Sequence, residues 1–249
     1  MSWLSETNVN IQNQITPFFR YFLMTEEKTD IVLTSQFAQD SNILNVSADH
    51  GITTNHWVSL WQNNRFFQAK VTNVATNAIT VDRRSCCNFE VATTKIVRGK
   101  VDLNVDGSST PVVFRCQLYN FSIPIDLTTF VLTMTHSAEA DDSKFGGITA
   151  ITSGLEMRFI DNYVFNWGIF KQNSDFRNYG GVVTYSNKAG GGTYATDINF
   201  NIESIFGISQ VVRIVPNQND AIQTTVNDNL SSLTTFRISI LGHYTEGEG

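Results

Sequence analysis

The chain has 249 residues, of which 41% are hydrophobic, 12% aromatic and 16% charged, and its formal net charge is −6. This length allows one large β domain or two smaller ones, each with a hydrophobic core. The low and acidic charge, with Arg83-Arg84 as the densest basic spot, argues against direct contact with nucleic acid or attraction to acidic membranes, because both need several cations on one face.

The cysteine pattern and the N-terminus indicate a protein folded in a reducing compartment without export. Three cysteines, with Cys86 and Cys87 adjacent and Cys116 separate, do not predict a disulfide framework, and their spacing predicts no metal site. No basic segment followed by an apolar stretch opens the chain, and no apolar run approaches the roughly 20 residues that span a bilayer. We therefore expect no cofactor and no membrane insertion.

The first thirty residues differ from the rest by a dense apolar cluster after Pro17. It contains Phe18, Phe19, Tyr21 and Phe22. One interpretation is that this cluster packs on its own domain. The other is that residues 1–29 form an arm whose apolar face is covered only when it docks on a neighbouring subunit.

Short segments with period-2 alternation follow and predict a small β-barrel or sandwich module over residues 30–100. Strands are expected at 31–34, 43–46, 57–61, 65–71 and 78–81, with a hairpin at Gln62-Asn63-Asn64. Trp57 and Trp61 share one face by period 2. Packing in a core or an interface is the main interpretation of these rings, and a sugar-binding platform is the alternative.

A second series of strand-like segments predicts a larger antiparallel β-sandwich over residues 101–249. The expected strands lie at 101–105, 112–116, 130–135, 155–160, 163–170, 181–185, 198–202, 211–215 and 236–241. No stretch of helical length carries a 3.6-residue apolar stripe. The predicted fold class is thus all-β, with two modules in tandem after the arm.

Three patterns invite a chemical interpretation. Asp102-x-Asn104-x-Asp106-Gly107 begins like a calcium loop, but Val113 stands where the bidentate Glu belongs, so an Asp-Gly hairpin is the main interpretation. The four histidines are scattered, and no G-x-S-x-G elbow accompanies them. The carboxylates that a glycosidase pair would need are available, but a solvated or interface-facing cluster is the simpler interpretation for them: Asp126, Glu139, Asp141, Asp142 and Asp161.

Several segments over residues 102–244 resemble a family of tailed-bacteriophage virion proteins. They are Asn104–Pro111 (NVDGSSTP), Asp141–Ile148 (DDSKFGGI), Thr152–Leu155 (TSGL) and Leu233–His243. Residues 31–82 are also similar to the small β module that often precedes this region. One departure is Ser153, where the family pattern has Asn. The resemblance implies a structural protein of the tail or neck without an assigned activity, and therefore no catalytic residue.

From the residues and the resemblance we expect a non-enzymatic virion protein, assembled in the host cytoplasm as a ring or sleeve subunit of the tail, neck or baseplate. Its partners would be copies of itself and other virion proteins. The candidate assembly interface comprises Phe18, Phe19, Tyr21, Phe22, Asp141, Asp142, Lys144 and Phe145. The alternatives are a capsid-decorating protein, a host-glycan-binding module built on Trp57 and Trp61, and, with least support, a depolymerase.

Overall fold

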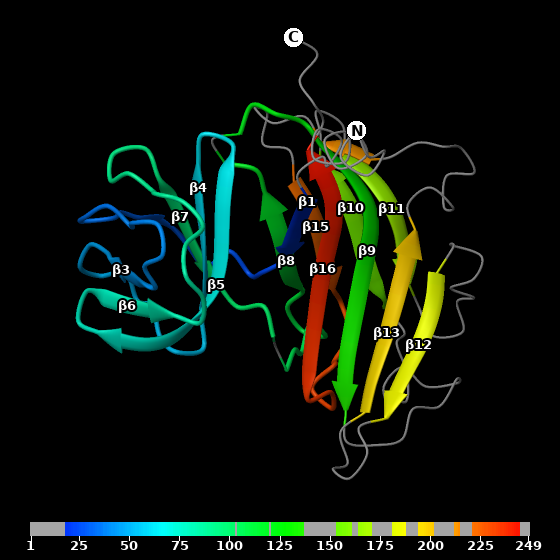
Figure 1. The fold of residues 1–249 in the computed structure, drawn as a ribbon. Coiled ribbons are helices and arrows are strands. Elements are labelled where there is room, and N and C mark those ends of the chain that lie inside the picture. The colour runs from blue at the N-terminus through cyan, green and yellow to red at the C-terminus, as the bar shows by residue number, and fades with distance from the viewer. Residues whose placement is uncertain are drawn as a thin grey trace, which may run out of the picture.

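The computed structural model describes residues 18–102, 104–119, 121–136, 153–160, 164–170, 181–187, 194–201, 212–214 and 221–244. These residues form sixteen strands, and the described part contains no helix. The predicted all-β class is confirmed. Figure 1 shows a small module on one side and a larger two-sheet module on the other.

The larger module pairs two antiparallel sheets. The first has the order β1-β16-β9-β13-β12, with β14 also pairing with β9; its strands are Phe18–Phe22, Thr235–Tyr244, Ile125–His136, Tyr194–Asn201 and Gly181–Asn187, with Val212–Ile214 as β14. The second has the order β11-β10-β15-β8; its strands are Val164–Phe170, Leu155–Ile160, Ala221–Val226 and Val112–Gln117. Apolar side chains of both sheets form the larger core.

The small module is one antiparallel sheet in the order β2-β7-β4-β5-β6-β3. Its strands are Lys28–Ile31, Lys95–Gly99, Trp57–Gln62, Arg65–Ala75, Ala78–Val81 and Ile43–Asn45. Asn63 and Asn64 have left-handed backbone (φ 47° and 62°), as the β4–β5 hairpin turn requires. This module encloses a second core around Phe37, Phe67 and Phe89.

The first described strand belongs to the larger module. β1 pairs along its whole length with β16 from the other end of the chain, from Phe18 opposite His243 to Phe22 opposite Ser239. The interpretation of residues 1–29 as an arm is therefore wrong for residues 18–22. The chain begins the sandwich, leaves it to build the small module, and returns at β8.

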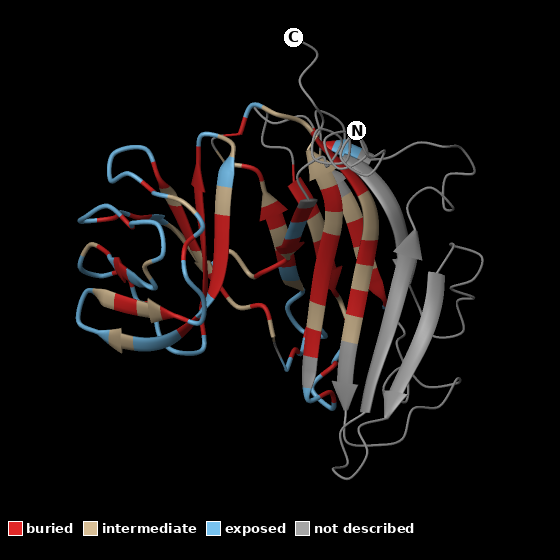
Figure 2. Cartoon of the chain, viewed as in Figure 1, coloured by how far each residue is buried: buried red, intermediate tan, exposed pale blue. Residues whose placement is uncertain are grey.

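The sheet of the small module contributes side chains to both cores. Trp57 and Trp61 of β4 and Val97 of β7 belong to the larger core, whereas Val58, Leu60 and Ile96 belong to the smaller one. Because successive side chains of a strand point to opposite faces, β4 and β7 are covered on both sides. Every residue of β4 is buried as a result (Figure 2).

Candidate functional site

The two tryptophans proposed as a sugar platform lie at the junction of the modules. The prediction that they share a face is confirmed, but that face packs on the sandwich. The Trp61 ring is fully buried, 5.3 Å from the Tyr21 ring and 5.5 Å from the Phe66 ring. Trp57 is 6% exposed and contacts Phe22. A sugar-binding platform on these rings is therefore wrong, since stacking on a sugar needs an open ring face.

The N-terminal half of the candidate assembly interface is mostly core. Phe19 and Tyr21 are fully buried within the chain, and the Tyr21 hydroxyl is 2.9 Å from the Ser59 hydroxyl of β4. These two residues cannot form an exposed interface, because their side chains point from β1 into the larger core. Phe22 is half-buried, and of Phe18 only the backbone pairing is described.

The other half of that interface, Asp141, Asp142, Lys144 and Phe145, lies outside the described residues. So do Glu139 and Asp161. Asp126, the described member of the carboxylate set, accepts two hydrogen bonds from the Arg213 guanidinium at 2.8 and 3.0 Å. This bidentate pair connects β14 to β9, which gives Asp126 a structural role.

The calcium-like segment has a different explanation in the structure. Asp102 accepts a bidentate pair of hydrogen bonds from Arg237 of β16, at 2.5 and 2.6 Å. Asp106 accepts the Ser108 backbone N–H at 3.0 Å and the Ser108 hydroxyl at 2.6 Å, and these bonds lower the pKa of Asp106. Both carboxylates therefore already have donors. The predicted Asp-Gly hairpin is wrong, because β8 pairs with β15, Asp106 bridges Asn229, and the described residues of 101–105 form no strand.

Two segments that carry the virion resemblance meet at Asp228, between β15 and β16. The backbone N–H groups of Ser153 and Gly154 both donate to the Asp228 carboxylate, at 3.1 and 2.5 Å. Gly107 donates to the Asp228 carbonyl at 2.9 Å and lies so close to β15 that a Cβ would be 2.1 Å from the Val226 oxygen. The motif residues thus fix the turns at one end of the sandwich.

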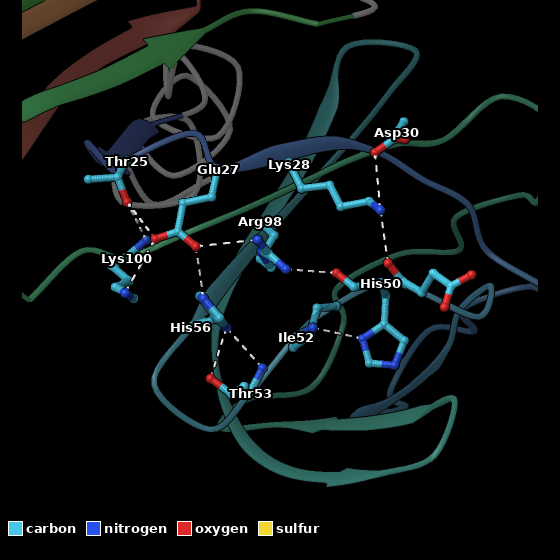
Figure 3. Close-up of polar contacts among 11 residues, drawn as sticks. Thr25, Glu27, Lys28, Asp30, His50, Ile52, Thr53, His56, Arg98 and Lys100 are labelled. Atoms are coloured by element: carbon cyan, nitrogen blue, oxygen red, sulfur yellow. Dashed lines mark hydrogen bonds and ion pairs between the residues drawn. The ribbon is translucent and has the colours of Figure 1, made fainter.

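A polar network that the sequence did not indicate joins the small module to the segment after β1 (Figure 3). Its centre is Glu27, whose carboxylate lies 3.0 Å from His56 Nε2, 3.4 Å from Arg98 and 3.5 Å from Lys100. Burial alone would raise the pKa of Glu27, but these neighbours outweigh it and the pKa is lowered. Burial, opposed by Glu27, lowers the pKa of His56.

The hydroxyl of Thr53, the imidazole of His56 and the carboxylate of Glu27 follow one another as in a catalytic triad, but no ring nitrogen of His56 is free to act as a base. The Thr53 hydroxyl is 3.0 Å from His56 Nδ1, with Glu27 on the other ring nitrogen. The backbone N–H of Thr53 donates to the same Nδ1 at 2.9 Å. The lone pair that a general base would use is therefore already occupied, and the imidazole serves to fix the loop before β4.

A basic hollow in the described part lies where β1 meets β5 and the loop after β6. We call it the basic groove, with a volume of about 350 Å³. Its lining contains three arginines and no carboxylate: Arg20, Phe22, Phe66, Phe67, Gln68, Arg83, Arg84 and Cys86. In a chain with a net charge of −6 this concentration of cations is a distinct local feature.

The two ends of the sandwich differ in how their edge strands are covered. Beside the small module, the Gln68 amide of β5 bonds both backbone groups of Phe22, at 2.9 and 2.8 Å. Met24 pairs with Arg115 of β8 through two backbone hydrogen bonds, at 3.2 and 2.8 Å. The near edges of both sheets, β1 and β8, therefore have partners.

At the far end, β12 and β11 each pair on one side only among the described residues. Figure 1 shows β12 on the side of the sandwich that faces away from the small module. β11 (VFNWGIF) and β12 (GVVTYSN) contain neither a charged residue nor a proline. The edges of the small module differ, since β2 carries Lys28 and Asp30 and β3 is only three residues long.

The sequence matches no known protein-family model and no curated protein. In the described ranges, no helix is long and apolar enough to cross a membrane. Nor does that part of the chain group three or more His, Cys, Asp or Glu side chains so that they could hold a metal ion.

Proposed function

We propose that this chain is a non-enzymatic structural subunit of a tailed-bacteriophage virion that assembles with copies of itself and with other virion proteins. The observation that carries the assembly part is the far end of the sandwich. Two neighbouring sheets end there in neutral strands whose outer edges have no partner among the described residues. The virion part rests on the resemblance over residues 102–244.

Edge strands of monomeric proteins are protected, because a free row of N–H and C=O groups pairs readily with another chain. Charges, prolines, bulges or very short strands provide this protection. β2 and β3 have such features, and β11 and β12 have neither charge nor proline. This contrast within one chain supports β11 and β12 as the strands that meet a neighbouring subunit.

A heterologous contact between such an edge and a different surface of the next copy would generate a ring when the rotation closes. A ring or sleeve in the tail, neck or baseplate is the form we propose for the assembly. The low charge of the chain agrees with a surface that is covered in the particle.

The test uses the two proline variants Val183→Pro and Thr184→Pro in β12. Successive N–H groups of a strand point to opposite edges, so one variant removes a hydrogen bond to β13 and the other removes only an outward donor. Unfolding in urea identifies the variant that leaves the fold stable. Light scattering after size exclusion then gives the mass of that variant and of the parent chain.

We expect an oligomer for the parent and a smaller species for the stably folded variant. A parent chain that stays monomeric at the highest attainable concentration would contradict the proposal. An unchanged oligomer in the stably folded variant would instead exclude β12 as the contact.

A further inference from the structure

The loop between β6 and β7 carries two adjacent thiols whose sulfur atoms are in contact. Cys86 is exposed, Cys87 is half-buried, and their Sγ atoms lie 3.8 Å apart. Both cysteines are free, and both lie outside the strands of the small module. Cys116, the third cysteine, is fully buried in the larger core and is therefore shielded from reagents in solution. A neighbouring pair of accessible thiols is the arrangement that thiol–disulfide exchange requires.

Backbone hydrogen bonds fix this loop on both sides of the thiol pair. Before the pair, the Ser85 N–H donates to the Ser41 carbonyl at 2.8 Å. After it, Phe89 and Phe37 exchange two backbone hydrogen bonds, at 3.0 and 2.9 Å, and both residues are buried in the smaller core. The two thiols are therefore held together at one place on the surface, and the entropy of bringing them together is already lost when the module folds.

The thiol pair opens onto the basic groove, because Cys86 is part of the lining of that groove. The described lining also contains Arg20, Arg83 and Arg84 but no carboxylate. Cations on the wall of a hollow raise the local concentration of anions and lower that of other cations. Glutathione disulfide carries more carboxylates than amines and is such an anion, so the groove favours its approach to Cys86.

We propose that Cys86 and Cys87 are a redox modification site, which closes to a disulfide between the two neighbouring residues by exchange with an anionic low-molecular-weight disulfide. In the first step the Cys86 sulfur loses its proton and attacks one sulfur of glutathione disulfide, and one glutathione thiolate leaves and takes up a proton. In the second step the Cys87 sulfur loses its proton and attacks Cys86 Sγ, and the second glutathione thiolate leaves and is protonated. Two cysteine thiols are thus oxidised, and one glutathione disulfide is reduced to two thiols. The inference goes beyond the proposed function and does not depend on how the sandwich assembles.

The order of the two attacks follows from exposure and from protonation. Cys86 is exposed in the groove and meets the reagent first. Burial, together with the adjacent Cys86 thiol, raises the pKa of Cys87 to about 11. Cys87 is therefore protonated at neutral pH and is the thiol that resolves the mixed disulfide on Cys86.

A disulfide between adjacent residues is strained. Their Cα atoms are about 3.8 Å apart across a trans peptide, whereas relaxed disulfides span about 4.4 Å or more. Strained disulfides are easily reduced and belong to the labile class. A large excess of reduced glutathione should therefore keep the pair open, and an excess of the oxidised form should close it.

The test is mass spectrometry of the chain after incubation, under argon, with glutathione at increasing ratios of the oxidised to the reduced form. Free thiols are blocked with N-ethylmaleimide before digestion. Trypsin cleaves after Arg84 and Lys95, so both cysteines of the pair lie in one peptide and Cys116 lies in another. The species measured are the blocked dithiol peptide, the peptide that has lost two hydrogens, and the glutathione adduct.

Two variants and a second reagent separate the steps. Cys87→Ser lacks the thiol that resolves the mixed disulfide. Arg20→Gln/Arg84→Gln removes two cations of the groove and keeps both thiols. Cystamine, a cationic disulfide, is the matched reagent for glutathione disulfide. Circular dichroism of each variant shows that a change in rate does not come from unfolding.

In the parent chain we expect the peptide that has lost two hydrogens. Its glutathione adduct should stay at least about tenfold below that of Cys87→Ser, because the neighbouring thiol makes the second step intramolecular. Arg20→Gln/Arg84→Gln should slow the reaction with glutathione disulfide roughly threefold and should not slow the reaction with cystamine.

A lasting glutathione adduct on the parent chain without the internal disulfide would overturn the proposal. So would disulfide-linked dimers through this peptide, or two free thiols at every ratio of oxidised to reduced glutathione. Equal slowing with both reagents in Arg20→Gln/Arg84→Gln would overturn the preference for an anionic disulfide.

Discussion

The Gln68 side chain connects the two modules, and its replacement by leucine tests that connection. Its amide accepts from the Phe22 N–H at 2.9 Å and donates to the Phe22 carbonyl at 2.8 Å, and Gln68 is 6% exposed. Leucine has a similar volume but leaves both backbone groups without a partner. Each such group costs about 1–3 kcal/mol, and because water from the adjoining groove satisfies part of the demand, we expect a total loss of about 2–4 kcal/mol.

The assay is equilibrium unfolding in urea, followed by near-ultraviolet circular dichroism, which senses the tryptophans at the junction. The control is Gln36→Leu in the same module, where the amide is exposed and bonds to Glu90. This change should stay within about 0.5 kcal/mol of the parent. A Gln68→Leu protein as stable as the control would refute the idea that this amide connects the modules.

Three further changes test other parts of the structure. Trp61→Ala should cost about 3–5 kcal/mol in urea unfolding, because it empties a fully buried site at the junction, and a loss below about 1 kcal/mol would show a loosely packed junction. The lowered pKa of His56 means that its contribution to stability is present above the unfolded value of about 6.5 and is lost as the pH falls below it. His56→Gln should therefore weaken the decline in stability between about pH 7 and pH 5, and an unchanged decline would exclude this histidine. Gly99→Ala would place a Cβ 1.7 Å from the Thr25 carbonyl oxygen, so it should lower the melting temperature clearly, and an unchanged value would contradict that close approach.

The sequence predicted correctly those features that depend on neighbouring residues, such as strand alternation and turn chemistry. Alternation in Trp57–Gln62 predicted a strand with both tryptophans on one face, and Asn63-Asn64 predicted the hairpin turn that the backbone shows. Local alternation does not show whether the second face of a strand is exposed to solvent or packs in another core. In β4 the second face is covered by β1, which comes from a different part of the chain.

Contacts between distant segments explain the predictions that were wrong or missed. The apolar cluster at Phe19 and Tyr21 is a strand because β16, at the opposite end of the chain, pairs with it. The calcium-like pattern at Asp102 is explained by Arg237, which lies 135 residues further along. Glu27 and His56 carry no recognisable spacing, so only the fold brings them together.

We propose that this chain assembles through β11 and β12 at the far end of its sandwich. The decisive measurement is light scattering of the parent chain, compared with whichever of Val183→Pro and Thr184→Pro keeps its unfolding free energy. We expect the parent chain to form an oligomer and the outward-facing proline to reduce the mass of that oligomer. A parent chain that remains a monomer at all concentrations would contradict it.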